Sequence, residues 1–345
     1  MEQRHISHRR KNPIWLYILI GLLAFLLVVT LTVVIFVNVT LNKIGRIVPS
    51  VQEYMTQDEA REYDLRQAVE EGQQRNPAVV YPELDESTIH WSTPTETIGS
   101  DQALVNILLI GQDRREGEGR QRSDSMILLS FNKPRGTITM TSFLRDLYVQ
   151  IPGYQSNRLN AAYAFGGMEL LDKTLETNFG IHIDANIEVD FDGFSSIIDT
   201  LGGVDIELTQ SEADYMGLSA GRQHMDGETA LDYSRIRYLD SDFGRTQRQR
   251  NVLSSVYHST KNLSLPKALD LVNNVFPLLT TDMTNTEILS YATNLFPMLS
   301  SGTLQTARIP ADDTYSYNTV RGMSVIIADF DANRQHLKDT LTPAA

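Results

Sequence analysis

Cysteine is absent from all 345 residues of the chain. Its absence excludes disulfide bonds, thiol catalysis and cysteine-ligated zinc. The chain also has no surplus of basic residues, because its formal net charge is −13 at pH 7. Nucleic-acid binding depends on a basic surface that neutralises phosphates, so the composition predicts no nucleic-acid partner.

Sequence motifs of several familiar enzyme classes are also missing. The 7 histidines never form a pair with the spacing of a zinc protease, and there is no P-loop. Gly117 and Gly119 lack the third glycine of a dinucleotide fingerprint. Gly217 and Gly221 match a nucleophile elbow in spelling, but no buried strand leads into them. These classes of site are therefore not expected.

Lysine is scarce beside arginine. Residues 101–345 contain 5 lysines and 16 arginines. Arginine offers a planar fork of donors that fits phosphate, whereas lysine acts as a point charge. The imbalance indicates either a specific phosphate site or codon usage combined with surface salt bridges, and the positions of the arginines must distinguish the two.

One long uncharged run stands near the N-terminus. Ile14 to Val37 contains no charged residue in 24 positions, enough to cross a hydrocarbon core of roughly 30 Å. Four basic residues precede it, so the positive-inside rule predicts a cytoplasmic tail at 1–13 and a single membrane helix at 14–38. The remainder is expected outside the cell. A cleaved signal peptide is the alternative, but its apolar region would be shorter.

Three further regions follow the uncharged run. Residues 39–102 are polar, with many helix formers and then prolines, which predicts an extracellular stalk or linker rather than a site. Residues 103–300 alternate apolar strands with helices, which predicts an α/β domain, layered α/β/α around a central mixed sheet. Residues 301–345 are expected to add a strand and a helix that pack on this domain.

Two aspartates flank the first two predicted strands of the domain. Asp113 follows the first strand and Asp124 begins the second. Ligands collect at strand ends in α/β sheets, because loops there present side chains without burying them. Carboxylate oxygens suit Mg²⁺, with Mn²⁺ as the alternative, and Mg²⁺ takes the rest of its shell from water and substrate phosphate. The other interpretation is a solvated charged loop.

A single arginine follows the third predicted strand. Arg145 would lie at the same sheet edge as Asp113 and Asp124. It is therefore a candidate for contact with an anion bound there. The alternative is a purely structural pairing with Asp146 or with a helix end.

A denser group of basic residues comes later in the chain. Arg235 and Arg237 are two positions apart and share a face if the backbone is extended. Arg245, Arg248 and Gln249 are spaced to share one face of a helix. Arg245 would lie in the first turn, where backbone N–H groups also favour an anion. This group favours a specific phosphate pocket over a random surface.

Eight segments between residues 103 and 260, in this order, resemble the LytR-CpsA-Psr family. They are NILLIGQDR from Asn106, RSDSM from Arg122, SFLRD from Ser142, RLNAAYAFGG from Arg158, VDFDGF from Val189, LGGVDI from Leu201, DGETALDYSRIRY from Asp226 and DFGRTQRQR from Asp242. One such segment is weak evidence, whereas eight in the family's order are specific. The family usually has proline before the strand-end arginine, where this chain has Leu144.

The resemblance implies an α/β fold with a hydrophobic tunnel for a polyprenyl chain. It implies a Mg²⁺-dependent phosphotransferase, of the polyisoprenyl-teichoic acid–peptidoglycan teichoic acid transferase type. Such an enzyme moves teichoic acid, capsule or a similar anionic glycopolymer from a polyprenyl-pyrophosphate carrier to peptidoglycan. By position, it implies that Asp113 and Asp124 hold the metal and act in catalysis with Arg145. It implies six pyrophosphate contacts: Arg122, Arg145, Arg235, Arg237, Arg245 and Gln249.

In this reaction a sugar hydroxyl would attack the phosphorus nearest the glycan and expel polyprenyl phosphate. Asp113, Asp124 and Asp146 all remain candidates for the general base. Two alternative functions also stay open. One is a pyrophosphatase acting on the same lipid. The other is a lipid-phosphate sensor without catalysis, including a membrane-bound transcriptional attenuator, although the 13 predicted cytoplasmic residues leave no DNA-binding domain inside the cell.

Overall fold

The computed structural model describes residues 36–47, 54–74, 81–99, 101, 103–112, 120–236, 239, 242–261, 270 and 273–342. These residues fall into two units, Met1–Lys43 and Ile44–Ala345. In the first unit, residues 36–41 are helical. The membrane span predicted at 14–38 lies almost entirely outside the described residues. Among those that are described, no helix has both the length and the apolar character needed to span a bilayer.

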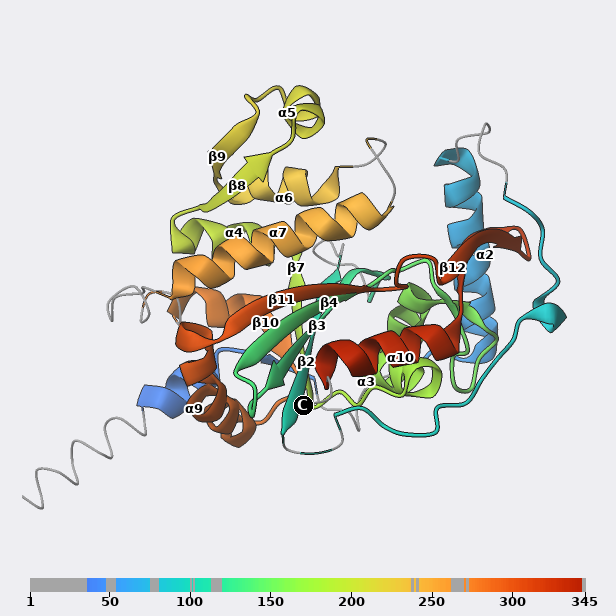
Figure 1. The fold of residues 1–345 in the computed structure, drawn as a ribbon, viewed down its shortest axis with the longest axis horizontal. Helices are drawn as coiled ribbons and strands as arrows, with labels where there is room; N and C mark the ends of the chain where they lie inside the picture. The colour runs from blue at the N-terminus through green and yellow to red at the C-terminus, as the bar shows by residue number, and fades with distance from the viewer. Residues whose placement is uncertain are drawn as a thin grey trace, which may run out of the picture. The chain divides into compact units, whose positions relative to one another are not determined.

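The second unit is built on a seven-stranded sheet in the order β1-β10-β7-β2-β3-β4-β11 (Figure 1). The strands are β1 (Gly45–Arg46), β2 (Leu104–Gln112), β3 (Ser123–Asn132), β4 (Thr137–Phe143), β7 (Ala185–Asp190), β10 (Leu279–Thr281) and β11 (Thr303–Ile309). β3 runs antiparallel to both β2 and β4, whereas β7 is parallel to β2 and β11 is parallel to β4. The predicted α/β fold with a central mixed sheet is therefore confirmed.

Helices cover both faces of this sheet (Figure 1). They are α2 (Gln57–Gln74), α3 (Leu159–Phe179), α4 (Phe191–Leu201), α5 (Gln210–Met216), α6 (Gly227–Arg235), α7 (Asp242–Thr260), α9 (Asn285–Ser301) and α10 (Phe330–Leu341). Alternate side chains of a strand point to opposite faces. Accordingly, Leu108 of β2 joins the core beneath α3 and α10, whereas Ile107 joins the core beneath α9.

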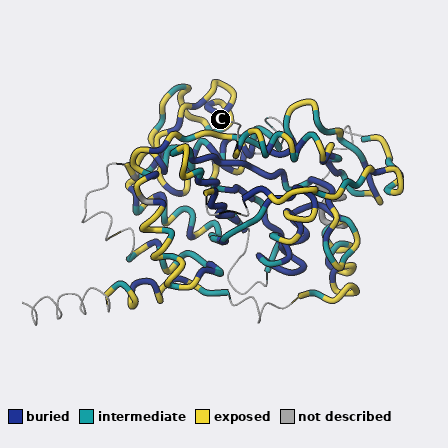
Figure 2. Tube along the Cα trace, turned by 60° about the horizontal axis from the view of Figure 1, so that its bottom comes forward, coloured by how far each residue is buried: buried dark blue, intermediate teal, exposed yellow. Residues whose placement is uncertain are grey.

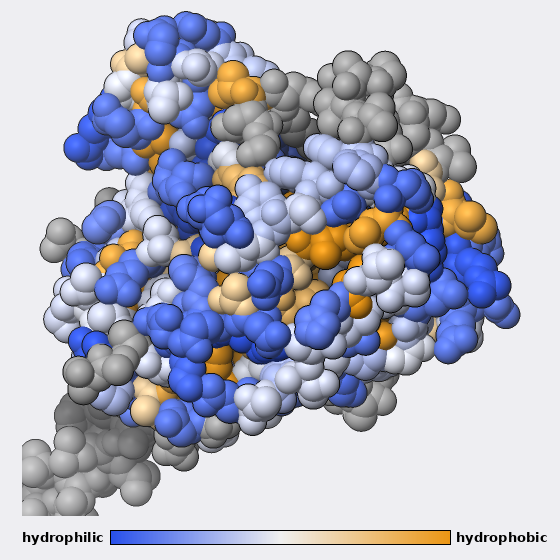
Figure 3. Space-filling view, turned by 45° about the vertical axis from the view of Figure 1, so that its right-hand side comes forward, coloured by the Kyte–Doolittle hydropathy of each residue, from blue (hydrophilic) through white to orange (hydrophobic). Residues whose placement is uncertain are grey.

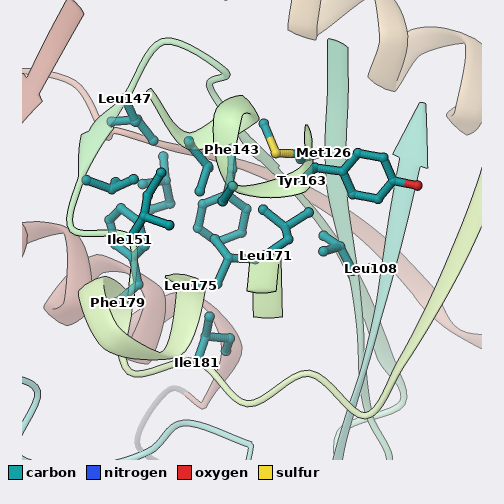
Figure 4. Packing of buried hydrophobic residues seen from close by; sticks show 14 of the residues in the cluster. Leu108, Met126, Phe143, Leu147, Ile151, Tyr163, Leu171, Leu175, Phe179 and Ile181 are labelled. Carbon is teal, nitrogen blue, oxygen red and sulfur yellow. The ribbon is translucent and has the colours of Figure 1, made fainter. Parts of the chain in front are cut away.

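The core on the α3 side is densely packed. Leu108 and Met126 from the sheet lie close to Tyr163 and Leu171 of α3 (Figure 4). Figure 2 shows that buried residues run along the middle of the chain trace, with exposed residues at its margins. Within α3 the helical backbone is interrupted at Gly167, whose φ of +64° is a conformation that glycine adopts without steric penalty.

Shorter elements complete the domain. They are β5 (Tyr148–Val149), β6 (Asn157–Arg158), β8 (Val204–Leu208), β9 (Gly221–Met225), β12 (Tyr315–Val320), β13 (Met323–Ala328) and the 3₁₀ turns η2 (Glu86–Thr88) and η3 (Phe276–Leu278). β8 and β9, which α5 connects, pair antiparallel and pack with α4, α6 and α7 around a second small core. β12 and β13 form another hairpin, which continues into α10.

Part of the segment expected to be a stalk packs against the α/β domain. Ala60 and Tyr63 of α2 are buried in the core with α3. Just before α2, the Met55 N–H donates to the Phe165 carbonyl oxygen at 2.8 Å, and the Tyr154 hydroxyl donates to the Met55 carbonyl oxygen at 2.5 Å. The extracellular stalk at 39–102 stays a prediction, but α2 itself belongs to the folded domain.

An ion pair ties α7 to α5. Arg248 Nε lies 2.8 Å from Glu212 Oε1, and only 2% of the arginine side chain is exposed. Arg248 Nη1 also donates to the Ile236 carbonyl oxygen, which follows α6. Glu212 in turn closes the capping box of α5 with Thr209. One buried guanidinium thus holds three helices together.

Replacing Glu212 by glutamine should destabilise the fold, because it leaves the Arg248 charge buried without a carboxylate. We expect Glu212→Gln to lower the free energy of unfolding by about 3 kcal/mol. The matched control is Glu207→Gln on the exposed face of β8, which should change it by less than about 0.5 kcal/mol. Urea denaturation of both variants measures the difference, and equal midpoints would show that the pair is not a structural tie.

Candidate functional site

The candidate site lies at one edge of the sheet, where β2 and β4 end and β3 begins. Because β3 is antiparallel to both neighbours, its first residues stand beside the last residues of β2 and β4. Asp124 is the second residue of β3, and Arg145 follows the end of β4 by two residues. Arg145 Nη1 donates to Asp124 Oδ1 at 2.6 Å. The predicted meeting of these two residues at one sheet edge is what the structure shows.

Six of the eight predicted site residues are described by the structure. Asp113 and Arg237 lie outside the described residues, so their predicted roles stay predictions. Asp124, Arg145, Arg235, Arg245, Gln249 and Arg122 are described and are placed below.

Arg145 stands between two carboxylates. Besides Asp124, its Nε lies 3.6 Å from Asp146 Oδ2. Partial burial disfavours the charge of Arg145, but the carboxylates of Asp146 and Asp124 outweigh burial and raise its pKa. From the sequence, pairing of Arg145 with Asp146 was the alternative to an anion-binding role. The structure shows that Arg145 pairs with both Asp146 and Asp124.

Two further arginines lie near Arg145 and pair with aspartates. Arg158 Nη1, at the start of α3, lies 3.6 Å from Asp146 Oδ1. Arg245 Nη2, in the first turn of α7, lies 3.1 Å from Asp242 Oδ1. With Arg145 and Asp124 this makes three arginines and three aspartates, which we term the charged cluster. Arg158 and Asp242 stood in the motifs quoted from the sequence but were not assigned roles there.

The carboxyl groups of Asp146 and Asp242 differ in protonation. Burial opposes ionisation of Asp146, but Arg145 and Arg158 hold its pKa well below the ordinary value. Burial, together with the hydrogen bond and the negative charge of Asp146, raises the pKa of Asp242 to about 6. A single proton held by Asp242 therefore joins the two side chains below that pH.

Arg122 is bound to α2. Its Nη2 lies 3.1 Å from Asp64 Oδ1, and Asn157 Nδ2 donates to Asp64 Oδ2 at 2.6 Å. The guanidinium carbon lies 5.6 Å from the centroid of the Tyr63 ring, within the range of a cation–π contact. Sequence reasoning missed Asp64, because α2 is polar on all sides and only the spacing of four residues from the buried Ala60 indicates which side of the helix faces inward.

A cavity of about 220 Å³ opens beside the charged cluster, between the sheet and helices α4, α6 and α7. Its apolar lining comes from Leu109, Ile110, Ile127, Ile187, Val189, Phe191, Phe194, Ile197, Ile198, Leu231, Leu253, Val256 and Leu279. Its polar lining includes Asp124, Ser125, Arg235, Arg245 and Gln249. Val256 lies eleven residues beyond Arg245, or about 16 Å farther along α7. The cavity therefore has a charged end and a long apolar interior.

The polar lining is held in place by local contacts. Ser125 Oγ donates to Gln249 Oε1 at 3.1 Å, and the Arg235 guanidinium carbon lies 4.3 Å from the centroid of the Phe191 ring. Among the described residues, Arg245 Nε is a buried donor without a hydrogen-bond partner. A buried donor of this kind favours an anionic ligand, because leaving it unsatisfied is unfavourable.

Arg248 does not share the cavity with Arg245 and Gln249, although the spacing predicted one common face. At about 100° per residue, Gln249 is rotated by about 40° from Arg245 about the helix axis, but Arg248 lies about 100° from Gln249. That rotation directs Arg248 to Glu212 instead. The prediction of a three-residue face was wrong for Arg248.

Of the two predicted magnesium ligands, Asp113 and Asp124, only Asp124 lies among the described residues. No group of three or more His, Asp or Glu side chains in the described part of the chain is arranged to hold a metal. Mg²⁺ does not need such a cage, since it keeps several waters and takes one or two protein carboxylates with substrate phosphate. The Asp124 carboxylate, 23% exposed at the charged end of the cavity, fits that coordination chemistry.

Comparison with known proteins agrees with this architecture. A model of the LytR_cpsA_psr family matches residues 62–340. The regulatory protein MsrR of Staphylococcus aureus (strain COL) is 32% identical over 248 residues, covering 69% of this chain and 74% of MsrR. The polyisoprenyl-teichoic acid–peptidoglycan teichoic acid transferase TagU of Oceanobacillus iheyensis is 32% identical over 306 residues, covering 84% of each chain.

A solved structure resembles the fold. It is the LytR-CPS2A-psr family protein YwtF (TagT), from Bacillus subtilis, with bound octaprenyl pyrophosphate lipid. The TM-score is 0.55 at 26% sequence identity, and the match covers 72% of this chain and 94% of that one.

The raised pKa of Asp242 makes stability depend on pH. In the unfolded chain this carboxyl releases its proton near its ordinary pKa of 3.8, whereas in the fold it keeps the proton up to about pH 6. The folded state therefore binds more protons in this window, and stability falls as pH rises through it. Asp242→Asn, which mimics the protonated acid, should gain stability relative to the wild type between about pH 4.5 and about pH 7.5. Urea unfolding of both proteins at both pH values measures their free energies of unfolding. If the difference between variant and wild type is the same at the two pH values, the shared proton is rejected.

Proposed function

Because the chain belongs to the LytR_cpsA_psr family, we propose that it is a phosphotransferase that moves an anionic glycopolymer from a polyprenyl-pyrophosphate carrier to peptidoglycan. The observation that carries this proposal is the cavity, whose apolar interior leads to a charged end with Arg235 and Arg245. An apolar chain with a pyrophosphate head has the same two parts. The proposed glycopolymer is teichoic acid, capsule or a similar anionic polymer.

The apolar interior is proposed to take the polyprenyl chain. Burial of apolar surface stabilises binding by about 0.8 kcal/mol for each CH₂ group removed from water. The wall of the cavity changes from strand side chains such as Ile187 to helix side chains such as Phe194 and Leu253, so the tail would pass between the sheet and α4 and α7. Anchoring by the uncharged run at 14–38, with the domain outside the cell, would bring the cavity near the lipid.

The charged end is proposed to bind pyrophosphate. Arg145, Arg235 and Arg245 supply guanidinium groups there, with Arg237 as a further contact predicted from the sequence. Guanidinium forks bind phosphate oxygens through paired, charge-assisted hydrogen bonds. Gln249, held by Ser125, adds a neutral donor. Arg122 is proposed to act from the α2 side, where Asp64 positions it.

Asp124 and Asp113 are proposed to hold Mg²⁺, with Mn²⁺ as a substitute. The ion would neutralise part of the pyrophosphate charge when bound. Asp124 then has two tasks, since its Oδ1 also accepts a hydrogen bond from Arg145. This contact fixes the guanidinium next to the phosphate that would carry the metal.

In the proposed reaction, the oxygen of an acceptor sugar hydroxyl forms a bond to the phosphorus nearest the glycan. The bond from that phosphorus to the bridging oxygen breaks, and polyprenyl phosphate leaves. The hydroxyl proton passes to a carboxylate. Arg145 and Arg158 hold the pKa of Asp146 below the ordinary value, which makes it a poor proton acceptor. Its role is to position Arg145, which leaves Asp113 and Asp124 for the base.

The proposal is tested with full-length protein in detergent, Mg²⁺, a labelled polyprenyl-pyrophosphate glycan and peptidoglycan fragments. Label on the peptidoglycan is the expected outcome. Cleavage of the lipid without transfer would favour a pyrophosphatase. Binding without any turnover across several donors would favour a sensor and reject catalysis.

Arg145→Ala should reduce transfer by about 10³-fold or more, because an arginine that stabilises the charge of a phosphoryl transition state contributes on that scale. The matched control is Arg222→Ala on β9, whose side chain is 74% exposed and which should transfer at the wild-type rate. Initial rates at saturating donor measure the effect. An Arg145→Ala variant within about tenfold of the wild type would exclude a direct role.

Filling the cavity should weaken binding of long lipids in particular. Ile197→Trp places a large ring among the apolar lining residues, so we expect long-chain polyprenyl pyrophosphate to bind at least tenfold more weakly, about 1.4 kcal/mol. A water-soluble analogue with a single isoprene unit should bind the charged end as before. Titration with both ligands, at a temperature where the variant is folded, makes the comparison. Equal losses for both ligands would place the tail elsewhere.

A further inference from the structure

Four aromatic rings form a continuous row next to the charged cluster. The ring of Phe243, which follows Asp242 on α7, has its centroid 4.8 Å from that of Tyr315. Tyr315 is 5.7 Å from Tyr317 on the same face of β12, and Tyr317 is stacked on Tyr81 at 5.1 Å with an interplanar angle of 12°. We term these four residues the aromatic row. Its Phe243 end directly follows Asp242 of the charged cluster in the chain.

The aromatic row is only half-buried. Phe243, Tyr315 and Tyr317 pack against the core on one side, and all four rings keep part of their surface exposed. No hydrogen bond to the hydroxyls of Tyr81, Tyr315 or Tyr317 occurs within the described part of the chain. Tyrosines that serve only the core are usually buried with the hydroxyl bonded. Those of this row differ in being partly exposed, although Arg308 lies over the Phe243 ring and Tyr81 is stacked on Tyr317.

Charged groups border the row at its inner end. The Arg308 guanidinium carbon lies 4.1 Å from the centroid of the Phe243 ring. Arg308 also pairs with Asp312, whose side chain is 83% exposed. Figure 3 turns the side with α2 and β12 toward the reader, where hydrophobic residues gather among hydrophilic ones, tyrosine itself being drawn as hydrophilic on this scale. Apolar ring surface with a polar border suits a ligand that has both kinds of surface.

We propose that the aromatic row is the acceptor subsite, where successive amino-sugar rings of a glycan strand lie against Phe243, Tyr315 and Tyr317. This inference rests on the proposed transfer reaction. A pyranose ring presents a face of C–H groups, which packs on an aromatic ring, and an edge of hydroxyl and acetamido groups, which hydrogen-bond to phenol hydroxyls and to Arg308. Phe243, at one end of the row, directly follows Asp242 of the charged cluster. A sugar bound against Phe243 would therefore have a hydroxyl next to that cluster.

The chemistry of the row separates it from the cavity. The cavity interior is lined mainly by aliphatic and phenylalanine side chains, which suits a lipid tail. The row carries three hydroxyls and is bordered by Arg308, and these polar groups would be poorly solvated against a lipid tail. Donor and acceptor thus approach the charged cluster from two surfaces of different composition.

The test uses full-length protein and soluble fragments of alternating N-acetylglucosamine and N-acetylmuramic acid, titrated by calorimetry without any donor. Tyr315→Ala and Tyr317→Ala should each weaken fragment binding by about five- to tenfold through loss of ring contact. Tyr317→Phe keeps the ring and should lose less than about threefold. The matched control is Tyr215→Ala on α5, a 54% exposed tyrosine outside the row, which should bind like the wild type.

Steady-state transfer gives an independent readout. The two alanine variants should raise the KM for the fragment and leave the KM for the lipid donor unchanged. Fragment binding that is equal in all variants, or absent from the folded wild type, would overturn the proposal. So would a rise in the donor KM alone, which would assign the row to the lipid. If fragments bind through the row but nothing is transferred, the proposed reaction fails and the glycan subsite stands.

Discussion

The ion pair between Arg145 and Asp124 is the constraint on which the site depends. Its two residues come from the loop after β4 and the start of β3, so the antiparallel register of these strands sets their 2.6 Å contact. Charges that are partly removed from water must be compensated. The alternation of arginine with aspartate satisfies this condition for Arg158 and Arg245 as well. The starts of α3 and α7 are thereby held at the same sheet edge.

The two faces of the sheet have different tasks. Beneath α3 and α10 the side chains fill the space, and Phe165, Leu171 and Phe179 are almost fully buried. Beneath α4, α6 and α7 the apolar side chains leave a cavity of about 220 Å³. A packed face gives the rigidity that positions the charged cluster, whereas the open face leaves room for an apolar ligand. Arg248 and Glu212 support the open face by joining α7 to α5.

Segments outside the α/β alternation contribute to the surroundings of the site. Asp64 of α2 pairs with Arg122, so a region with the composition of a spacer supplies a carboxylate next to the charged cluster. Tyr315 and Tyr317 of β12 bring an aromatic surface to Phe243 from the C-terminal region. Both contributions come from parts of the chain where the sequence carries no recognised motif.

The sequence by itself determined the strand and helix alternation, the mixed sheet and the gathering of Asp124 and Arg145 at one sheet edge. It could do so because hydrophobic periodicity and the succession of strands and helices along the chain are local properties, and because the family motifs lie at strand ends. Only the tertiary structure decided that Arg248 faces Glu212, that Asp64 holds Arg122, that the carboxyl groups of Asp146 and Asp242 adjoin and that four aromatic rings form a row. Each of these depends on contacts between residues far apart in the chain or on helix rotation, and neither composition nor spacing encodes the partner of a side chain.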